Sequence, residues 1–144
     1  MDGAADRLEH AWALACQVED PCWEGFSARA IGLLEEGRGR STEARRWLAE
    51  AATRCTRVPD RYVWAHGYVL DAHAALSVRA GDPDAMVTAH ELLDLAARCG
   101  MRELVVRAQL HLAALGVEGM LESATLLARD IDNPVLVPLL ATAA

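Results

Sequence analysis

The chain has 144 residues, the length of one ordinary domain, and a net charge of −7. Hydrophobic residues make up 53% of the sequence and aromatic residues only 5%, so that a core must consist mainly of Ala, Leu and Val side chains. The acidic balance argues against direct nucleic-acid contact. The chain has neither a long uninterrupted apolar run nor an apolar N-terminus, which argues against a membrane span and a signal peptide, and we expect a cytoplasmic protein.

Eight helices and no strands are predicted, because apolar residues recur at helical spacing and Gly, Pro and Asp interrupt the pattern. The first four helices are expected over 4–19, 22–36, 41–57 and from after Asp60 to 80. Ser41 or Thr42 is placed to cap the third helix and Asp60 the fourth. A helical hairpin over 82–116 follows, and shorter helices over 118–131 and 133–142 end the chain.

The hairpin over 82–116 has the clearest boundaries. Asp82 is placed to cap its first helix, and Pro83 follows where a missing N–H costs nothing. Gly100 and Gly116 are placed to end the two helices in the left-handed conformation. Because the connection at Gly100 is short, the two helices are expected to be antiparallel neighbours.

The ends of the first, third, fifth and seventh helices share a register. Each has Ala followed three residues later by Cys or Ile, at 13 and 16, 52 and 55, 96 and 99, and 128 and 131. The spacings of 39, 44 and 32 residues have the size of a two-helix solenoid repeat. Second helices align too, and Gly67 matches Ala108 where two helices would cross closely. We therefore predict an all-α fold: a single domain forming an α-α superhelix of about four antiparallel helix hairpins, tetratricopeptide-like, over roughly 4–36, 41–80, 82–116 and 118–142.

Four stretches carry a resemblance to a known class of protein: DPCWEGFSARAIGLLEEGRG, PDRYVWAHGYVLDAHAALSVRAGD, LDLAARCGMRELVVRAQLHLAALG and LARDIDNPVL. They resemble the tetratricopeptide-like helical region of large actinobacterial transcriptional regulators of the LuxR-type and antibiotic-regulatory classes. Those regulators also carry an ATPase core and a DNA-binding domain. This chain has no glycine-rich phosphate loop, no Lys and no recognisable DNA-binding helix pair. The resemblance therefore implies only the sensor or scaffold arm, a non-catalytic regulatory module that contacts a protein partner or a neighbouring domain.

No constellation of residues points to catalysis, a cofactor or a metal. Cys16, Cys55 and Cys99 occupy the repeated position and are expected to be buried, whereas Cys22 is the least constrained. No two of these Cys have the close spacing of zinc ligands. His66 and His73 lie seven residues apart on one face, and we interpret them as surface or hydrogen-bonded residues.

The candidate groove lies on the second helices of the first two hairpins. Trp23 and Trp64 either pack between repeats or line a groove for a peptide or small molecule, with Arg61, Tyr68 and Asp71 beside them. Asp71 lies in an otherwise apolar helix, so an inward position requires a donor such as an Arg or Trp of a neighbouring helix. The alternative function is a small-molecule effector sensor with its pocket between repeats near these residues.

Structural roles are assigned to several other residues. Trp12 and Trp47 belong to apolar stripes and are assigned to the core. Glu103 and Arg107 are one turn apart, the spacing of a helical ion pair. Seven Arg lie between 38 and 61, and we interpret them as a solvated helix surface, with an anion-binding patch as the alternative.

The last ten residues, 135–144, carry no charge, although a terminal repeat should present a polar face to water. Either this segment folds back over the last hairpin, or it docks on a second copy of the chain, giving a homodimer, or on another domain. We expect removal of 135–144 to lower solubility or to change the oligomeric state.

Overall fold

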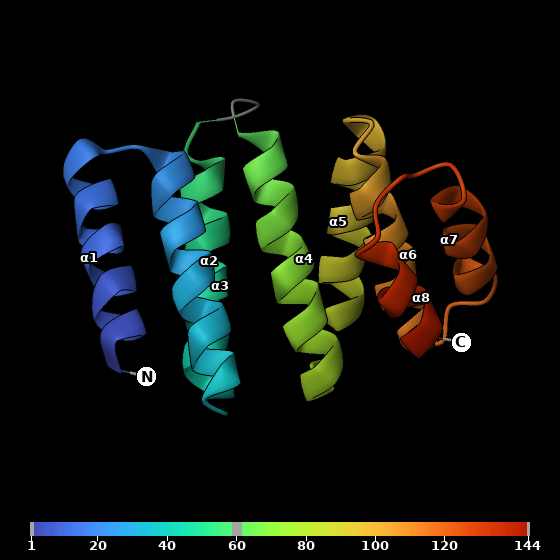
Figure 1. Cartoon of the computed structure of the whole chain (residues 1–144), viewed down its shortest axis with the longest axis horizontal. Coiled ribbons are helices and arrows are strands. Elements are labelled where there is room, and N and C mark those ends of the chain that lie inside the picture. The colour runs from blue at the N-terminus through green and yellow to red at the C-terminus, as the bar shows by residue number, and fades with distance from the viewer. Residues whose placement is uncertain (1, 59–61, 144) are drawn as a thin grey trace.

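The computed structural model describes residues 2–58 and 62–143, and these residues form eight helices and no strand (Figure 1). In chain order the helices are α1 (Asp2–Val18), α2 (Pro21–Gly37), α3 (Ser41–Thr56), α4 (Val63–Ala80), α5 (Ala85–Arg98), α6 (Arg102–Ala114), α7 (Met120–Ala128) and α8 (Leu136–Ala143). The prediction of an all-α chain is confirmed. None of the described helices is both long enough and apolar enough to cross a membrane.

The helices form two layers. Each helix contacts the next along the chain, and in addition α2 contacts α4, α4 contacts α6, and α6 contacts α8. We call α2, α4, α6 and α8 the even layer. The odd layer consists of α1, α3, α5 and α7, whose backbones do not approach one another within the described residues, although side chains of α1 and α3 meet. Figure 1 shows the helices following one another in a row, so that packing is confined to near neighbours along the chain.

Glycine allows the closest helix contacts. A Cβ atom at Gly32 of α2 would lie 3.0 Å from Cγ of Leu48 and 3.2 Å from the carbonyl oxygen of Ala44, both on α3. A Cβ atom at Gly67 of α4 would lie 2.7 Å from Cδ1 of Leu104 on α6. The close helix crossing predicted at Gly67 is therefore confirmed.

The predicted start of α2 and the predicted helix ends at Gly100 and Gly116 are confirmed, and Gly81 ends α4 in the same way. Oδ1 of Asp20 accepts hydrogen bonds from the backbone N–H groups of Cys22 at 2.9 Å and Trp23 at 3.2 Å, as an N-cap residue does. The glycines have positive φ angles that favour residues without a Cβ atom. They are Gly81 (63°), Gly100 (66°) and Gly116 (85°).

Two predicted caps are wrong. Asp82 does not cap α5, because a turn in which the N–H of Ala85 donates to the carbonyl oxygen of Asp82 delays the helix. Instead the carboxylate of Asp82 accepts from the N–H of Asp84 at 3.2 Å and pairs with Arg45 of α3 at 3.1 Å. Ser41 is the first residue of α3, whose N-cap position is Arg40 and has no side-chain cap. Asp60 lies outside the described residues.

The cysteines follow the predicted register only in part. Cys55 is 4% exposed. The pKa of its thiol is raised to about 11, mainly by burial and to a smaller extent by the neighbouring Cys22. Cys16 is half-buried. Cys99 is exposed, contrary to prediction, because it follows the last residue of α5 and lies in the turn. Cys22 is buried at 7% exposure, because the first turn of α2 faces α3.

The arginines predicted to form a solvated surface pair mostly with acids of the same chain. Glu24 is 1% exposed, and one of its oxygens accepts from Arg54 at 2.6 Å and from Arg57 at 2.8 Å. Arg54 also lies over the ring of Trp12, 5.1 Å from its centroid. Further pairs are Arg38 and Arg40 with Glu35, and Arg45 with Asp82. Arg45, Arg54 and Arg57 therefore link α3 and its end to other parts of the chain, Arg38 and Arg40 pair locally at the end of α2, and these five guanidinium groups are occupied by acids of the chain.

Trp12 and Trp47 are half-buried against the cluster formed by α2, α3 and α4, which confirms their assignment to the core. Their rings meet edge to face, with centroids 5.4 Å apart.

The uncharged end of the chain folds back over the last hairpin. Leu136 is 2% exposed and packs in a cluster with residues of α6 and α7, whereas Val135 and Val137 remain 50% and 67% exposed.

Candidate functional site

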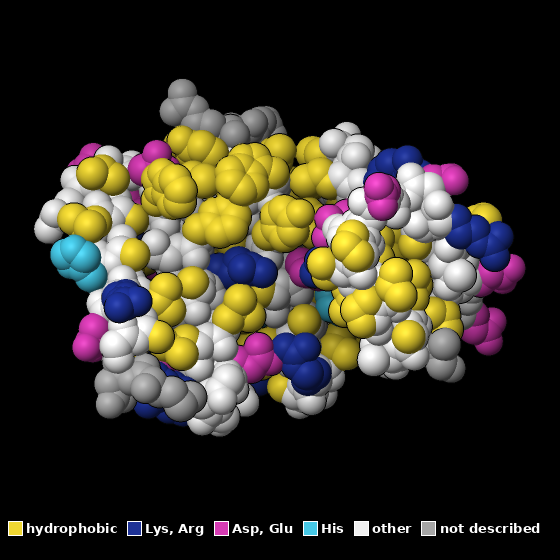
Figure 2. Space-filling view, viewed as in Figure 1, with side chains coloured by type: hydrophobic (Ala, Val, Ile, Leu, Met, Phe, Trp, Pro, Cys, Tyr) yellow, Lys and Arg dark blue, Asp and Glu magenta, His cyan; other side chains and the backbone are white. Residues whose placement is uncertain are grey.

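Aromatic side chains gather on the even layer where α2 and α4 begin. Phe26 of α2 packs against Trp64 of α4, with ring centroids 5.1 Å apart and planes inclined by 34°. Trp23 lies one turn before Phe26 and is 64% exposed, and Trp64 is 49% exposed. Figure 2 shows hydrophobic side chains gathered over these ends of α2 and α4. We call Trp23, Phe26 and Trp64 the aromatic patch.

Arg29 lies next to the aromatic patch and bridges α2 to α4. Its Nε–H donates to the carbonyl oxygen of Tyr68 at 2.9 Å. Burial lowers the pKa of the guanidinium, the carboxylate of Asp71 raises it, and the positive charge of Arg107 lowers it. A guanidinium remains protonated in spite of such effects, so Arg29 places a half-buried positive charge beside aromatic rings.

Asp71 forms the centre of a polar cluster between α4 and α6. It is 6% exposed, and its two oxygens have different partners. Arg107 donates to Oδ2 at 3.1 Å, and Nε2 of His111 lies 2.9 Å from Oδ1. Glu103 accepts from Arg107 at 2.9 Å. The predicted pairing of Glu103 with Arg107 and the predicted Arg donor for an inward Asp71 are both confirmed.

Burial and pairing act in opposite directions on Asp71. Desolvation by burial is the largest single influence and raises the pKa of the carboxyl group. The hydrogen bond and charge of His111, together with those of Arg107, lower it by more. The net result is a pKa below the ordinary value for Asp, so Asp71 is ionised at neutral pH and holds Arg107 and His111 in place.

A cavity of about 290 Å³ opens beside this cluster, between α4, α6 and α8. Asp71, Arg107 and His111 contribute its polar wall, and Leu110 and Leu139 contribute apolar surface. Both partners of Asp71 are already engaged in the protein. The cavity therefore offers a fixed set of polar groups beside an apolar wall, the composition of a small-molecule site.

The structure brings four of the five predicted groove residues to one side of α2 and α4. Trp64, Tyr68 and Asp71 follow one another at helical spacing on α4, with Trp23 on the adjacent α2. Tyr68 contributes its carbonyl oxygen, while its side chain is half-buried against the core between α4, α5 and α6. Trp23 does not pack between repeats, because most of its surface is exposed. Arg61 lies outside the described residues.

Sequence reasoning missed Arg29 and His111 as neighbours of these residues. The spacing of Glu103, Arg107 and His111 contains a usable signal, since polar residues at intervals of four lie on one face of a helix. That stripe faces Asp71 in the structure. The position of Arg29 has no comparable signal, because its acceptor is a backbone oxygen 39 residues away.

Comparisons with known proteins returned no relatives. No family model matches the chain, and no match was found among curated proteins or solved structures. Within 2–58 and 62–143, no group of three or more His, Cys, Asp or Glu side chains is arranged to hold a metal ion. The function must therefore be inferred from the geometry of this chain.

Proposed function

We propose that the chain is a non-catalytic interaction module that presents the aromatic patch to a protein partner or neighbouring domain, within the sensor or scaffold arm of a bacterial transcriptional regulator. The observation that carries this proposal is the exposure of Trp23 at 64% and Trp64 at 49% on one face. Exposed tryptophans on a contiguous apolar surface are typical of interaction sites, because their burial on binding contributes much of the affinity.

The arrangement of the helices supports the same proposal. Contacts limited to neighbouring helices are expected of a tetratricopeptide-like array, which uses one layer of helices as an extended binding surface. The aromatic patch and the cluster around Asp71 both lie on the even layer, in reach of one extended partner. A cytoplasmic location, as for the regulators that the sequence resembles, is part of this proposal.

The experiment compares two double variants as bait in affinity capture from the source bacterium, with quantitative mass spectrometry. Trp23→Ser with Trp64→Ser removes the patch. The matched control, Val87→Ser with Leu126→Ser, removes two side chains of the odd layer that are 57% and 63% exposed. We expect a DNA-binding regulator to be captured by the wild type and the control and lost from the patch variant. Equal capture by both variants, or the absence of any such regulator, would overturn the proposal.

A second candidate function, a small-molecule effector sensor, is favoured by the cavity beside Asp71. NMR spectra of the chain titrated with a fragment library distinguish the two functions by the place of binding. Saturable shifts confined to His111, Leu139 and their neighbours would favour the sensor. Shifts confined to the indole signals of Trp23 and Trp64 would favour the interaction module.

A further inference from the structure

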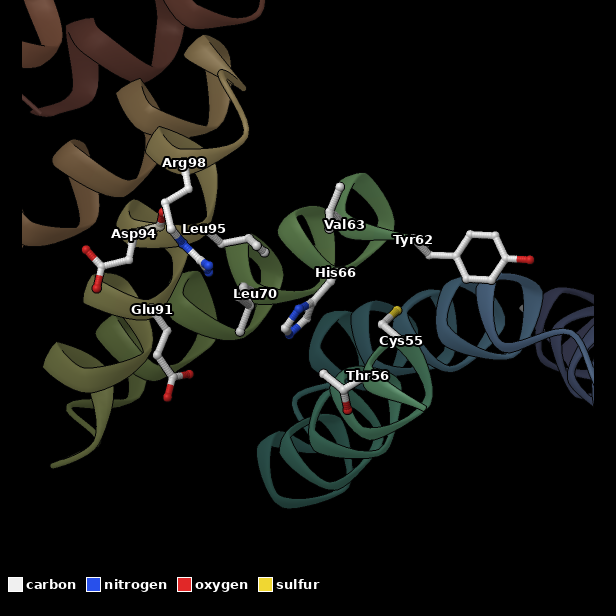
Figure 3. A pocket seen from close by; sticks show the side chains of 10 residues that line it. All are labelled: Cys55, Thr56, Tyr62, Val63, His66, Leu70, Glu91, Asp94, Leu95 and Arg98. Atoms are coloured by element: carbon white, nitrogen blue, oxygen red, sulfur yellow. The ribbon is translucent and has the colours of Figure 1, made fainter. Parts of the chain in front are cut away.

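A second opening lies on the opposite side of α4 from the aromatic patch. Because α3 and α5 do not contact each other, the side of α4 that faces the odd layer lies at the bottom of a groove between them. The groove has a volume of about 630 Å³, within the range of small-molecule sites. Figure 3 shows its floor, formed by His66 and Leu70, with Leu95 beside them. We call this opening the α3–α5 groove.

The α5 wall of the groove carries three charged side chains, Glu91, Asp94 and Arg98. Figure 3 shows Arg98 extending toward Leu70, Glu91 lying along the same wall, and Asp94 pointing away. Nε of Arg98 donates to the carbonyl oxygen of Asp94 at 3.3 Å. Neither Glu91 nor Arg98 takes part in an ion pair among the described residues. Both charged groups are therefore available to a ligand.

The described lining residues on α3, on α4 and at Tyr62 add no charge at neutral pH. Burial lowers the pKa of His66, and the carboxylate of Glu91 only partly opposes this effect, so the imidazole is neutral. Thr56 of α3 uses its hydroxyl to donate to backbone carbonyl oxygens of its own helix. Among the lining residues that the structure describes, the charges are therefore those of α5, and of these Glu91 and Arg98 lie along the groove.

The spacing of these two charges defines the ligand. Glu91 and Arg98 are seven residues apart on α5, which places their Cα atoms about 10 Å apart along the helix axis. Leu95 lies between them on the helix and is 8% exposed, and Leu70 of the floor is 4% exposed. We propose that the α3–α5 groove binds an extended zwitterion, with an ammonium group at Glu91, a carboxylate at Arg98 and an apolar chain of about 10 Å between them.

The experiment uses three probes of equal length: ω-aminooctanoate, octanoate and octylamine. Each is titrated into the full chain, and affinity is measured from the NMR shifts of the His66 ring and the Leu70 methyl groups. A merely apolar groove would favour the two probes with a single charge, because the zwitterion is the most strongly hydrated. We expect ω-aminooctanoate to bind about two- to fivefold more tightly than either, since it alone forms both ion pairs.

Two variants assign the charges. Glu91→Gln should reduce the affinity for ω-aminooctanoate to that for octanoate, and Arg98→Gln should reduce it to that for octylamine. The matched controls Glu122→Gln and Arg129→Gln change exposed charges on and next to α7 and should leave all affinities unchanged. The proposal is overturned if a probe with one charge binds as tightly as the zwitterion, or if no probe gives saturating shifts at millimolar concentration.

An ω-amino acid and a short peptide share this chemistry, and a further arm of the titration separates them. The tripeptide Ala-Leu-Ala spans at most about 10 Å and carries the same terminal charges. Tighter binding of the tripeptide would identify a peptide end-to-end ligand, and tighter binding of ω-aminooctanoate an amino acid with a methylene chain. A reduced affinity on Arg98→Gln is expected in either case. Because this groove lies on the odd-layer side of α4, these results are independent of those for the aromatic patch.

Discussion

At the scale of single residues, the two most buried acids on α2 and α4 are both held by arginines from other helices. Glu24 of α2 is 1% exposed and accepts from Arg54 and Arg57, whereas Glu50, which also pairs with Arg54, is half-buried. A buried carboxylate that loses its charge leaves guanidinium groups without an acceptor. The pair of arginines therefore makes Glu24 a stabilising residue in spite of its burial.

We predict that Glu24→Gln lowers the free energy of unfolding by about 1–3 kcal/mol, because the neutral amide oxygen that replaces the carboxylate weakens both charge-assisted hydrogen bonds in a buried setting. The matched substitution Glu50→Gln removes a more exposed partner of the same Arg54 and should cost less than about 0.5 kcal/mol. Urea unfolding followed by tryptophan fluorescence measures both. Equal losses for the two variants would show that Glu24 is no more important than a surface acid.

Asp71 gives the chain a dependence of stability on pH with a definite sign. Its pKa is lowered in the folded chain, against the effect of burial, by His111 and Arg107. A group of this kind contributes stability above its unfolded pKa, about 3.9 for Asp, and loses that contribution as the pH falls through the folded pKa. Asp71→Asn should therefore cost about 1–3 kcal/mol at pH 7 and progressively less below about pH 4.

The control for Asp71 is Asp130→Asn, because the side chain of Asp130 is 78% exposed and lies 3.7 Å from Arg102. This substitution should change the unfolding free energy little at either pH. Urea unfolding of the wild type and both variants at pH 7 and near pH 3 makes the comparison. A cost of Asp71→Asn that is the same at both pH values would contradict the role assigned to the ionised carboxylate.

At the scale of helices, substitutions at two glycines of α2 separate the effect of close helix packing on stability from the effect of backbone conformational freedom. Gly32→Ala should destabilise the chain by about 1–3 kcal/mol, because the new methyl group meets Leu48 Cγ at 3.0 Å and the Ala44 carbonyl oxygen at 3.2 Å. Gly37→Ala, in the last turn of the same helix, meets nothing within 4 Å and should stabilise by up to about 1 kcal/mol. Thermal unfolding of both variants measures the difference, and stabilisation by Gly32→Ala would show that α2 and α3 can move apart freely.

The helices themselves could be predicted from the sequence, but the contacts between them only in part. Local signals placed Gly100 and Gly116 where the chain turns left-handed, because each helix end is decided within a few residues. The partners of Glu24 lie 30 and 33 residues away, and their pairing depends on how α2 and α3 are rotated against each other. Helical periodicity defines a face and leaves this rotation open.

The candidate site was likewise predictable only where a local signal in the sequence existed. Asp71 could be singled out because a carboxylate in an apolar helix needs a donor, and Glu103 with Arg107 because they are one turn apart. The α3–α5 groove could not be predicted, since it results from the absence of contact between two helices that are not consecutive. His66 and Leu70 therefore showed helical spacing in the sequence, but nothing that indicated an opening above them.

At the scale of the whole molecule, packing between near neighbours makes the two ends of the row nearly independent. The core consists of separate clusters between adjacent helices: α2, α3 and α4 share one, whereas α6, α7 and α8 share another. In such an array the loss of a terminal element is felt mainly by its neighbours. A single central core would instead transmit the loss throughout the chain.

Removal of residues 135–144 tests this independence. The truncation takes away Leu136, which is 2% exposed, and uncovers its neighbours Val106 and Leu110 on α6. We expect self-association in sedimentation velocity, because newly exposed apolar surface drives association. Amide NMR signals of α6 and α7 should shift while those of α1, α2 and α3 stay in place.

The control is the full-length variant Val137→Ser, which alters a side chain that is 67% exposed and keeps Leu136 in position. This variant should show the same mass distribution and NMR signals as the wild type. Signals of α1 and α2 that shift on truncation would mean that the helices share one cooperative core, and an unchanged mass distribution would mean that α8 does not protect α6.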